Sequence, residues 1–231
     1  MSEREAIDSF IDKWRARWPE WSVAEVFVPH AQRETAAAWM ALVQELTDAA
    51  WGGSDPRPGE AKLGWWAEEL QGWTRGIRRH PLGIVLQKFP VDWLLLARAL
   101  PALRDSRERP VDSDEAHTQL RPFAEAAASI EAGLFGGAAD AQALVAANLL
   151  QLRLAHHPGE AVPLQVLAQV GEGAALAAWS QQLAGRISVR GGTAPRRVLA
   201  GIAKSRLRRG DAVQPVGAMR ALWAAWGAAR G

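Results

Sequence analysis

A tryptophan-rich stretch between Glu60 and Pro81 constrains the fold of this chain more than any other segment. Its large apolar residues recur at steps of three and four, which places them on one stripe of a helix; they are Leu63, Trp66, Leu70, Trp73 and Ile77. Because proline cannot continue a helix, we expect this helix to stop at Arg79 and His80. Buried indole rings contribute a large apolar area, so the stripe predicts a core helix.

The composition of the whole chain also favours helices. The chain has 231 residues, of which 48% are hydrophobic, and it has no tyrosine, which favours helix over sheet. It also has no cysteine, and this excludes disulfides, thiolate metal sites and cysteine nucleophiles. No uncharged apolar run of about 18 residues occurs, and the acidic start MSEREAIDSF lacks the layout of a secretory signal. We therefore predict an all-α fold, with residues 1–231 as one domain, and a cytoplasmic location.

Capping signals and prolines divide the chain into helices. Ser2 followed by Glu5 is a capping box, so a helix should begin at once and run to about Trp18. The other expected helices span 30–51, 82–89, 91–105, 111–137, 140–156, 173–187, 195–209 and 214–230, and 52–59 and 157–164 read as loops. We expect Pro101 and Pro122 to kink or interrupt their helices.

The order of residues in the tryptophan-rich stretch, a Trp pair, then Glu-Leu, Gly and His-Pro, resembles the squalene/phytoene synthase family. The resemblance is best between Arg33 and Gly171, and it includes NLLQLRLAHHPGEAVPLQVLAQVG, which is similar to the second signature of the family. It implies an isoprenoid-synthase-like helical bundle. It also implies two aspartate-rich motifs that face each other and hold Mg²⁺ around a prenyl diphosphate.

The first aspartate-rich motif is only partly present. The family pattern has two aspartates one helical turn apart, and the matching residues here are Gln44 and Asp48. Glu45 lies three residues before Asp48 and could share its face of the helix. Gln44, Glu45 and Asp48 are therefore the candidate catalytic positions of a degenerate motif. The alternative is a solvated polar helix face.

The second motif has lost its acid. Asn148 and Arg153 match the asparagine and arginine of the family, but Leu154 follows where the family has aspartate. The resemblance marks Arg33, Asn148 and Arg153 as substrate-binding residues. The pair His156 and His157 reads as a helix C-terminus rather than a metal site, so we expect no bound metal.

The missing carboxylates predict loss of Mg²⁺-dependent prenyltransferase activity. We expect a cofactor-free protein that binds a lipid or isoprenoid, or that acts with a protein partner in assembly. A mitochondrial complex I assembly factor with the same domain is a precedent for such divergence. The alternative is an active head-to-head prenyl diphosphate transferase with atypical motifs, which would need Mg²⁺.

Small residues mark the segment that lines the pocket in the family. They are Ala124, Ala127, Ala128 and Gly133, and the apolar residues Trp39, Leu42 and Leu149 could supply the walls. This composition has two interpretations. Either a cavity accepts an isoprenoid tail, or the small side chains let helices pack closely without a void.

The C-terminal part of the chain is strongly basic. From Gly173 onward ten basic residues face one acid, Asp211, a charge of +9 that leaves −7 of the total +2 for residues 1–172. This asymmetry predicts either a membrane-peripheral contact with an anionic surface or, as we favour, ion pairing within the fold. The segment 196–209 has no interleaved aromatic residues, and the chain has no Walker, HExxH or GxSxG motif, so we predict no nucleic-acid partner.

Overall fold

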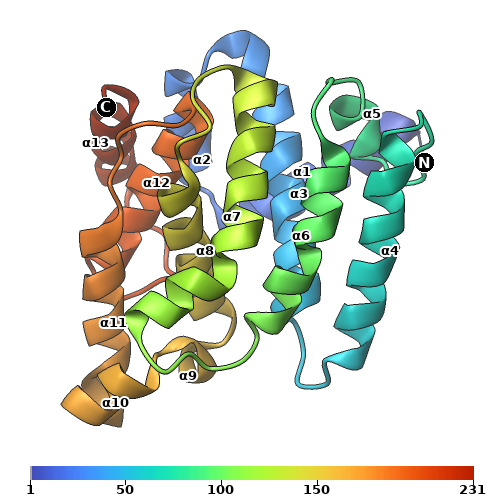
Figure 1. Cartoon of the computed structure of the whole chain (residues 1–231). Coiled ribbons are helices and arrows are strands. Elements are labelled where there is room, and N and C mark those ends of the chain that lie inside the picture. Colours follow the sequence, from blue (N-terminus) through green and yellow to red (C-terminus); the bar gives the residue numbers. More distant parts are fainter. Residues whose placement is uncertain (1) are drawn as a thin grey trace.

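The computed structural model describes residues 2–231, and every regular element in that range is helical (Figure 1). Two 3₁₀ turns, η1 (Glu25–Phe27) and η2 (His30–Gln32), accompany thirteen α-helices. The α-helices are α1 (Glu3–Arg17), α2 (Trp21–Ala24), α3 (Arg33–Trp51), α4 (Arg57–Trp73), α5 (Gly83–Leu86), α6 (Trp93–Asp105), α7 (Ser113–Phe135), α8 (Gln142–His156), α9 (Pro158–Ala161), α10 (Leu164–Val170), α11 (Glu172–Arg186), α12 (Ala194–Leu207) and α13 (Ala218–Ala229). The predicted all-α class is confirmed.

Helix α3 lies at the centre of the bundle. Of its residues from Thr35 to Trp51, only Asp48 is not fully buried, because α1, α4, α6 and α8 all contact this helix. Along the chain, α7 packs against α6 and α8, and α12 packs against α8 and α13. Figure 1 shows α4 at one side of the molecule and α13 at the other. The buried apolar side chains form one continuous core.

The tryptophan helix α4 is shorter than its apolar pattern predicts. Leu63, Trp66, Leu70 and Trp73 are buried as expected, but the helix ends at Trp73. Gly76 then adopts a positive φ of 77°, and the backbone N–H of Ile77 donates to the carbonyl of Gly72 at 3.0 Å. This is a glycine-terminated C-cap, which turns the chain away and leaves Ile77 56% exposed. The prediction that the helix continues to Arg79 is therefore wrong.

Two prolines lie inside helices, and one segment expected as a loop is partly helical. Helices α6 and α7 continue through Pro101 and Pro122, both of which face solvent, so neither residue interrupts its helix. A proline is best tolerated on the solvent side, where long helices curve outward. The segment expected as a loop after His156 contains the short helix α9, and α10 follows it.

The small residues of α7 serve close packing. Ala124, Ala127 and Ala128 are at most 2% exposed, as are Trp39, Leu42 and Leu149. A Cβ atom on Gly133 would lie 2.4 Å from Cγ1 of Val91, so this glycine is needed for a close approach. The interior beside α7 also holds buried polar side chains, described below. Of the two interpretations, these observations favour close packing over a cavity beside α7, because the space is already filled by side chains.

No helix within residues 2–231 is long and apolar enough to cross a lipid bilayer.

Candidate functional site

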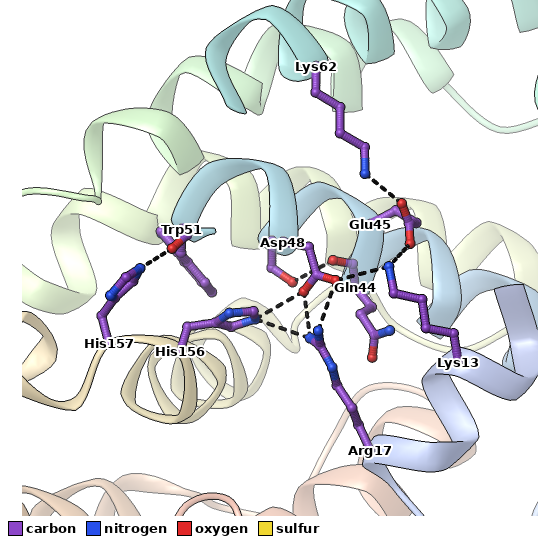
Figure 2. Close-up of polar contacts among 10 residues, drawn as sticks. Lys13, Arg17, Gln44, Glu45, Asp48, Trp51, Lys62, His156 and His157 are labelled. Carbon is purple, nitrogen blue, oxygen red and sulfur yellow. Dashed lines mark hydrogen bonds and ion pairs between the residues drawn. The ribbon is translucent and has the colours of Figure 1, made fainter. Parts of the chain in front are cut away.

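The two acids of the degenerate motif face the N-terminal helix. Lys13 and Arg17 lie one turn apart on α1, on the side that packs against Glu45 and Asp48 of α3 (Figure 2). From α4 comes Lys62, and from the end of α8 comes His156. We call the six side chains Lys13, Arg17, Glu45, Asp48, Lys62 and His156 the ion-pair cluster.

Glu45 lies between two lysines. Its Oε1 accepts a hydrogen bond from Nζ of Lys13 at 2.6 Å, and its Oε2 accepts one from Nζ of Lys62 at 2.7 Å. The side chain of Glu45 is only 5% exposed, whereas both lysines are nearly half exposed. The lysine side chains therefore cover the carboxylate and neutralise it from the solvent side.

Asp48 is held by three groups from two other helices. Nη1 and Nη2 of Arg17 donate to its two carboxylate oxygens at 2.5 and 3.1 Å, and Nε2 of His156 lies 3.1 Å from Oδ1. Nζ of Lys13 lies 3.3 Å from Oδ2, so this lysine bridges Asp48 and Glu45. The prediction that these two acids share a helix face is confirmed.

The contacts of the ion-pair cluster stabilise both carboxylates in their charged form. Burial alone would raise the pKa of Asp48, but hydrogen bonds from His156 and Arg17 outweigh burial and lower this pKa to about 2. Burial would also raise the pKa of Glu45, but the hydrogen bonds and charges of Lys13 and Lys62 outweigh burial and leave this pKa below its ordinary value. Both acids are therefore anions at neutral pH.

The residues present do not fit a magnesium site. Mg²⁺ needs carboxylate oxygens that are free to coordinate it, but three basic side chains already occupy the oxygens of two acids. The cluster has a net positive charge without the His156 ring, so its field repels a divalent cation. Within residues 2–231, no group of three His, Asp or Glu side chains is arranged to hold a metal ion.

Gln44, the third residue of the degenerate motif, is buried beside the cluster on α3. Its backbone carbonyl accepts a hydrogen bond from Oγ1 of Thr47 at 3.0 Å. No ion pair joins its side chain to the cluster, since an amide carries no charge. The position therefore supplies no acid to complement Asp48.

Asn148 lies in a different place, inside the bundle. Its Oδ1 accepts a hydrogen bond from Nη1 of Arg196 on α12 at 3.1 Å. Nε of Arg196 donates to Oε1 and Oε2 of Glu131 at 3.0 and 3.1 Å, and Nε1 of Trp39 donates to Oε1 at 2.7 Å. All four side chains are buried. We call Trp39, Glu131, Asn148 and Arg196 the buried network; it joins α3, α7, α8 and α12.

Arg153 and Arg33 bind backbone carbonyls. Nη2 of Arg153 donates to the carbonyls of Arg107 and Glu108 at 3.0 and 2.5 Å, and burial lowers the pKa of this arginine to about 10. Nε of Arg33 donates to the carbonyl of Val28 at 3.1 Å. The structure thus brings none of the three predicted substrate-binding residues together with Glu45 and Asp48. Leu154, which the resemblance aligns with an aspartate, is 3% exposed in the core.

A pocket of about 470 Å³ lies beside the ion-pair cluster. Helices α1 and α8 form two of its walls, and residues from the segment between α12 and α13 form the third. Arg17 and His156 belong both to this pocket and to the cluster. Most of the lining is apolar, and it includes Trp18, Leu152 and Val213. Such a combination of apolar wall and a few polar groups is typical of small-molecule sites.

Part of the basic C-terminal segment pairs with acids of the N-terminal part. Arg196 pairs with Glu131 in the buried network, and Nη2 of Arg206 lies 2.5 Å from Oε2 of Glu20. Arg206 also stacks on the Trp18 ring, with 4.2 Å between Cζ and the ring centroid. At the surface, Nη2 of Arg186 also lies 2.8 Å from Oδ1 of Asp114. Ion pairing within the fold therefore accounts for three of the ten basic residues.

The basic members of the ion-pair cluster are not predictable from the sequence alone. Lys13 and Arg17 have the spacing of one helical turn, which is a usable signal, but nothing in the sequence pairs α1 with α3. The sequence predicts that His156 belongs to a helix C-terminus, and α8 does end there, but the sequence does not predict the contact with Asp48. Comparison of the sequence with protein-family models and with curated proteins gives no match.

Proposed function

We propose that this chain is a squalene/phytoene synthase-like protein with an isoprenoid-synthase-like bundle that has no Mg²⁺-dependent prenyltransferase activity. It acts by binding, either of a lipid or isoprenoid ligand or of a protein partner in assembly. The observation that carries this proposal is the ion-pair cluster. The acids at the position of the first metal-binding motif are fully paired with Lys13, Arg17, Lys62 and His156.

The paired acids remove the electrostatic part of the prenyltransferase reaction. In the family reaction, metal ions neutralise the leaving diphosphate, and each lowers the activation barrier by several kcal/mol. Each 1.4 kcal/mol is worth about tenfold in rate, so losing the metal sites costs several orders of magnitude. Leu154 supports the same conclusion, because it leaves the facing helix α8 without an aspartate.

The pocket next to the cluster supports the binding role. An isoprenoid or lipid chain gains free energy by burying apolar surface against Trp18, Leu152 and Val213. An anionic head group at the edge would meet Arg17 and His156 directly, without a metal ion between them. Binding of this kind is independent of Mg²⁺.

Two assays on the purified protein test the proposal. The first incubates it with farnesyl or geranylgeranyl diphosphate, Mg²⁺ and NADPH and analyses the extracted lipids. We expect no squalene, phytoene or cyclopropyl diphosphate intermediate. The second measures binding of farnesyl diphosphate by calorimetry, and we expect the same affinity with Mg²⁺ and with EDTA. Product formation at useful turnover would instead support the active transferase.

A matched pair of variants locates the ligand. Ala155 lines the pocket on α8, so Ala155→Trp fills the space and should abolish binding of farnesyl diphosphate. Ala177 is exposed on α11 and lines none of these walls, so Ala177→Trp is the control and should bind like the wild type. Equal binding by both variants would place the ligand elsewhere. Absence of binding in the wild type leaves the assembly role as the proposed function.

A further inference from the structure

The last helix, α13, has two different apolar faces. The first consists of small residues, Ala221, Ala225 and Ala228, which are buried. They pack closely on α12, where a Cβ atom on Gly201 would lie 2.7 Å from the carbonyl oxygen of Ala224. The second face carries Met219, Trp223 and Trp226, which are 67%, 61% and 38% exposed. The spacing of four and three residues makes these three side chains one exposed apolar stripe.

The tryptophans of the stripe are arranged in contact with each other. Their ring centroids are 5.3 Å apart in an edge-on geometry, and Cζ of Arg230 lies 3.9 Å from the Trp226 ring centroid. Two indoles on a solvent-facing stripe leave a large apolar area in water, at a cost that burial would remove. A stripe of this kind on a monomer surface marks an interaction site.

Four basic residues lie beside the stripe, next to Trp223. Lys204, Arg208 and Arg209 come from α12 and the residues that follow it, and Arg220 comes from α13; with Trp223 they line a groove of about 610 Å³. Within residues 2–231, no ion pair joins any of these four residues to a carboxylate. Asp211, the nearest acid in the sequence, instead accepts hydrogen bonds from the backbone N–H groups of Val213 and Gln214. The groove therefore concentrates positive charge, and none of its four basic side chains forms an ion pair with the described part of the chain, although the charge of Asp211 acts on Arg209. We call it the basic groove.

The pKa of Lys204 is lowered, as an excess of positive charge in the groove would require. Burial lowers it, and the charge of neighbouring Arg208 lowers it further, with no acid among the causes that could oppose them. An anion bound in the groove would relieve this repulsion.

We propose that the exposed apolar stripe and the basic groove form a docking surface for an anionic phospholipid bilayer. The tryptophans and Met219 enter the interface between head groups and acyl chains, where indole rings are favoured, while α13 lies in the plane of the membrane. Lipid phosphates occupy the basic groove, since each basic residue near an anionic surface strengthens binding by about fivefold. This proposal does not depend on the proposed pocket ligand, because the two sites share no lining residue.

The chemistry of the surface favours a membrane over a nucleic acid. Arginines and tryptophans could also contact phosphates and bases. However, Met219 extends the exposed stripe with a flexible side chain that offers neither a flat ring for stacking nor a strong hydrogen-bonding group for base edges, and Trp226 already stacks with Arg230. An amphipathic helix with a basic border is the pattern of interfacial membrane helices.

Vesicle sedimentation of the full chain tests the proposal. The probes are vesicles of phosphatidylcholine alone and vesicles in which one third of the lipid is phosphatidylglycerol. We expect strong partitioning onto the anionic vesicles at low salt, little onto the neutral ones, and a large decrease at high potassium chloride, because salt screens the attraction. A single-stranded oligonucleotide is tested in parallel.

Matched variants separate the two parts of the surface. Arg208→Gln with Arg220→Gln should reduce partitioning onto anionic vesicles by about 25-fold, and Trp223→Gln with Trp226→Gln by about tenfold or more. The controls are Arg75→Gln with Arg78→Gln, and Ile77→Gln, which change exposed residues beside α4 on the other side of the molecule (Figure 1). All of these side chains are at the surface, and thermal melts check that each variant is folded.

The outcomes decide the proposal. Loss of partitioning in the groove and stripe variants, with unchanged controls, supports it. It is overturned if the wild type partitions equally onto neutral and anionic vesicles, or if the controls lose as much as the groove variant. It is also overturned if the oligonucleotide binds through Arg208 and Arg220 while anionic vesicles do not bind.

Discussion

At the scale of single residues, neighbours decide the charge of several buried groups. His80 is a clear case, because its ring packs against Phe10 and Trp66 with centroid distances of 4.4 and 4.5 Å. The backbone N–H of Leu82 donates to its Nδ1 at 3.2 Å. Burial lowers the pKa of His80 to about 4, although Glu45 and Glu69 act in the opposite direction. The ring is thus neutral in the folded protein over a range where an unfolded histidine is charged.

This difference predicts a pH dependence of stability. Below an unfolded pKa of about 6.5, the unfolded chain binds a proton that the folded chain does not, so the free energy of unfolding should fall. The decrease should continue down to about pH 4 and amount to about 2–3 kcal/mol for His80. His80→Asn keeps an acceptor for Leu82 but cannot titrate. The measurement is urea unfolding of both proteins from neutral pH to pH 4. If their difference in stability does not change across this range, the interpretation of His80 is wrong.

The contacts of Glu45 show which side-chain neighbours local spacing can predict and which it cannot. Glu45 and Asp48 were predicted to share a face, and they do, because three residues on a helix fix that geometry. Lys13 and Lys62 lie 32 and 17 residues from Glu45 along the chain. Their contact with Glu45 depends on how helices pair, and no spacing rule encodes that pairing.

At the scale of elements, α4 carries the clearest test of the apolar pattern. The Trp66 ring is fully buried and packs edge-on against Trp65 at 5.1 Å. Trp66→Ala leaves a cavity in the core, so the free energy of unfolding should fall by about 3–5 kcal/mol. Trp223→Ala, which removes an indole that is 61% exposed, is the matched control and should change it by under about 0.5 kcal/mol. Thermal and urea denaturation measure both. Similar losses in the two variants would contradict the assigned core stripe.

Helix ends were predictable where a side chain caps them. Oγ of Ser2 accepts from the N–H of Glu5 at 3.2 Å, and the N–H of Ser2 donates to Oε2 of Glu5 at 2.7 Å, as the capping box predicts. The end of α4 was missed because the apolar spacing continues to Ile77 while the backbone does not. Gly76 was the available signal, since glycine after a helix often adopts the left-handed conformation.

At the scale of the whole molecule, the buried network connects parts of the chain that are far apart. Trp39, Glu131, Asn148 and Arg196 come from four helices, and Nε1 of Trp39 and the guanidinium of Arg196 both bind the carboxylate of Glu131. The sequence predicted that Asn148 lines a binding site, but Glu131 was not singled out. A glutamate in an alanine-rich helix resembles any surface glutamate until its partner on another helix is known.

The buried network predicts a characteristic set of stabilities. Glu131→Leu leaves the Arg196 guanidinium buried without its anion, and Arg196→Met leaves the Glu131 carboxylate buried without its cation. Each single variant should lose about 3–5 kcal/mol, because an unpaired charge cannot be solvated there. The double variant removes both charges and replaces them with apolar side chains of similar size. It should therefore be more stable than either single variant, although Trp39 and Asn148 lose a hydrogen-bond partner. Urea unfolding of the four proteins gives the interaction energy. If the double variant instead loses the sum of the two single losses, the two charges act independently, and Glu131 and Arg196 do not hold the four helices together as a pair.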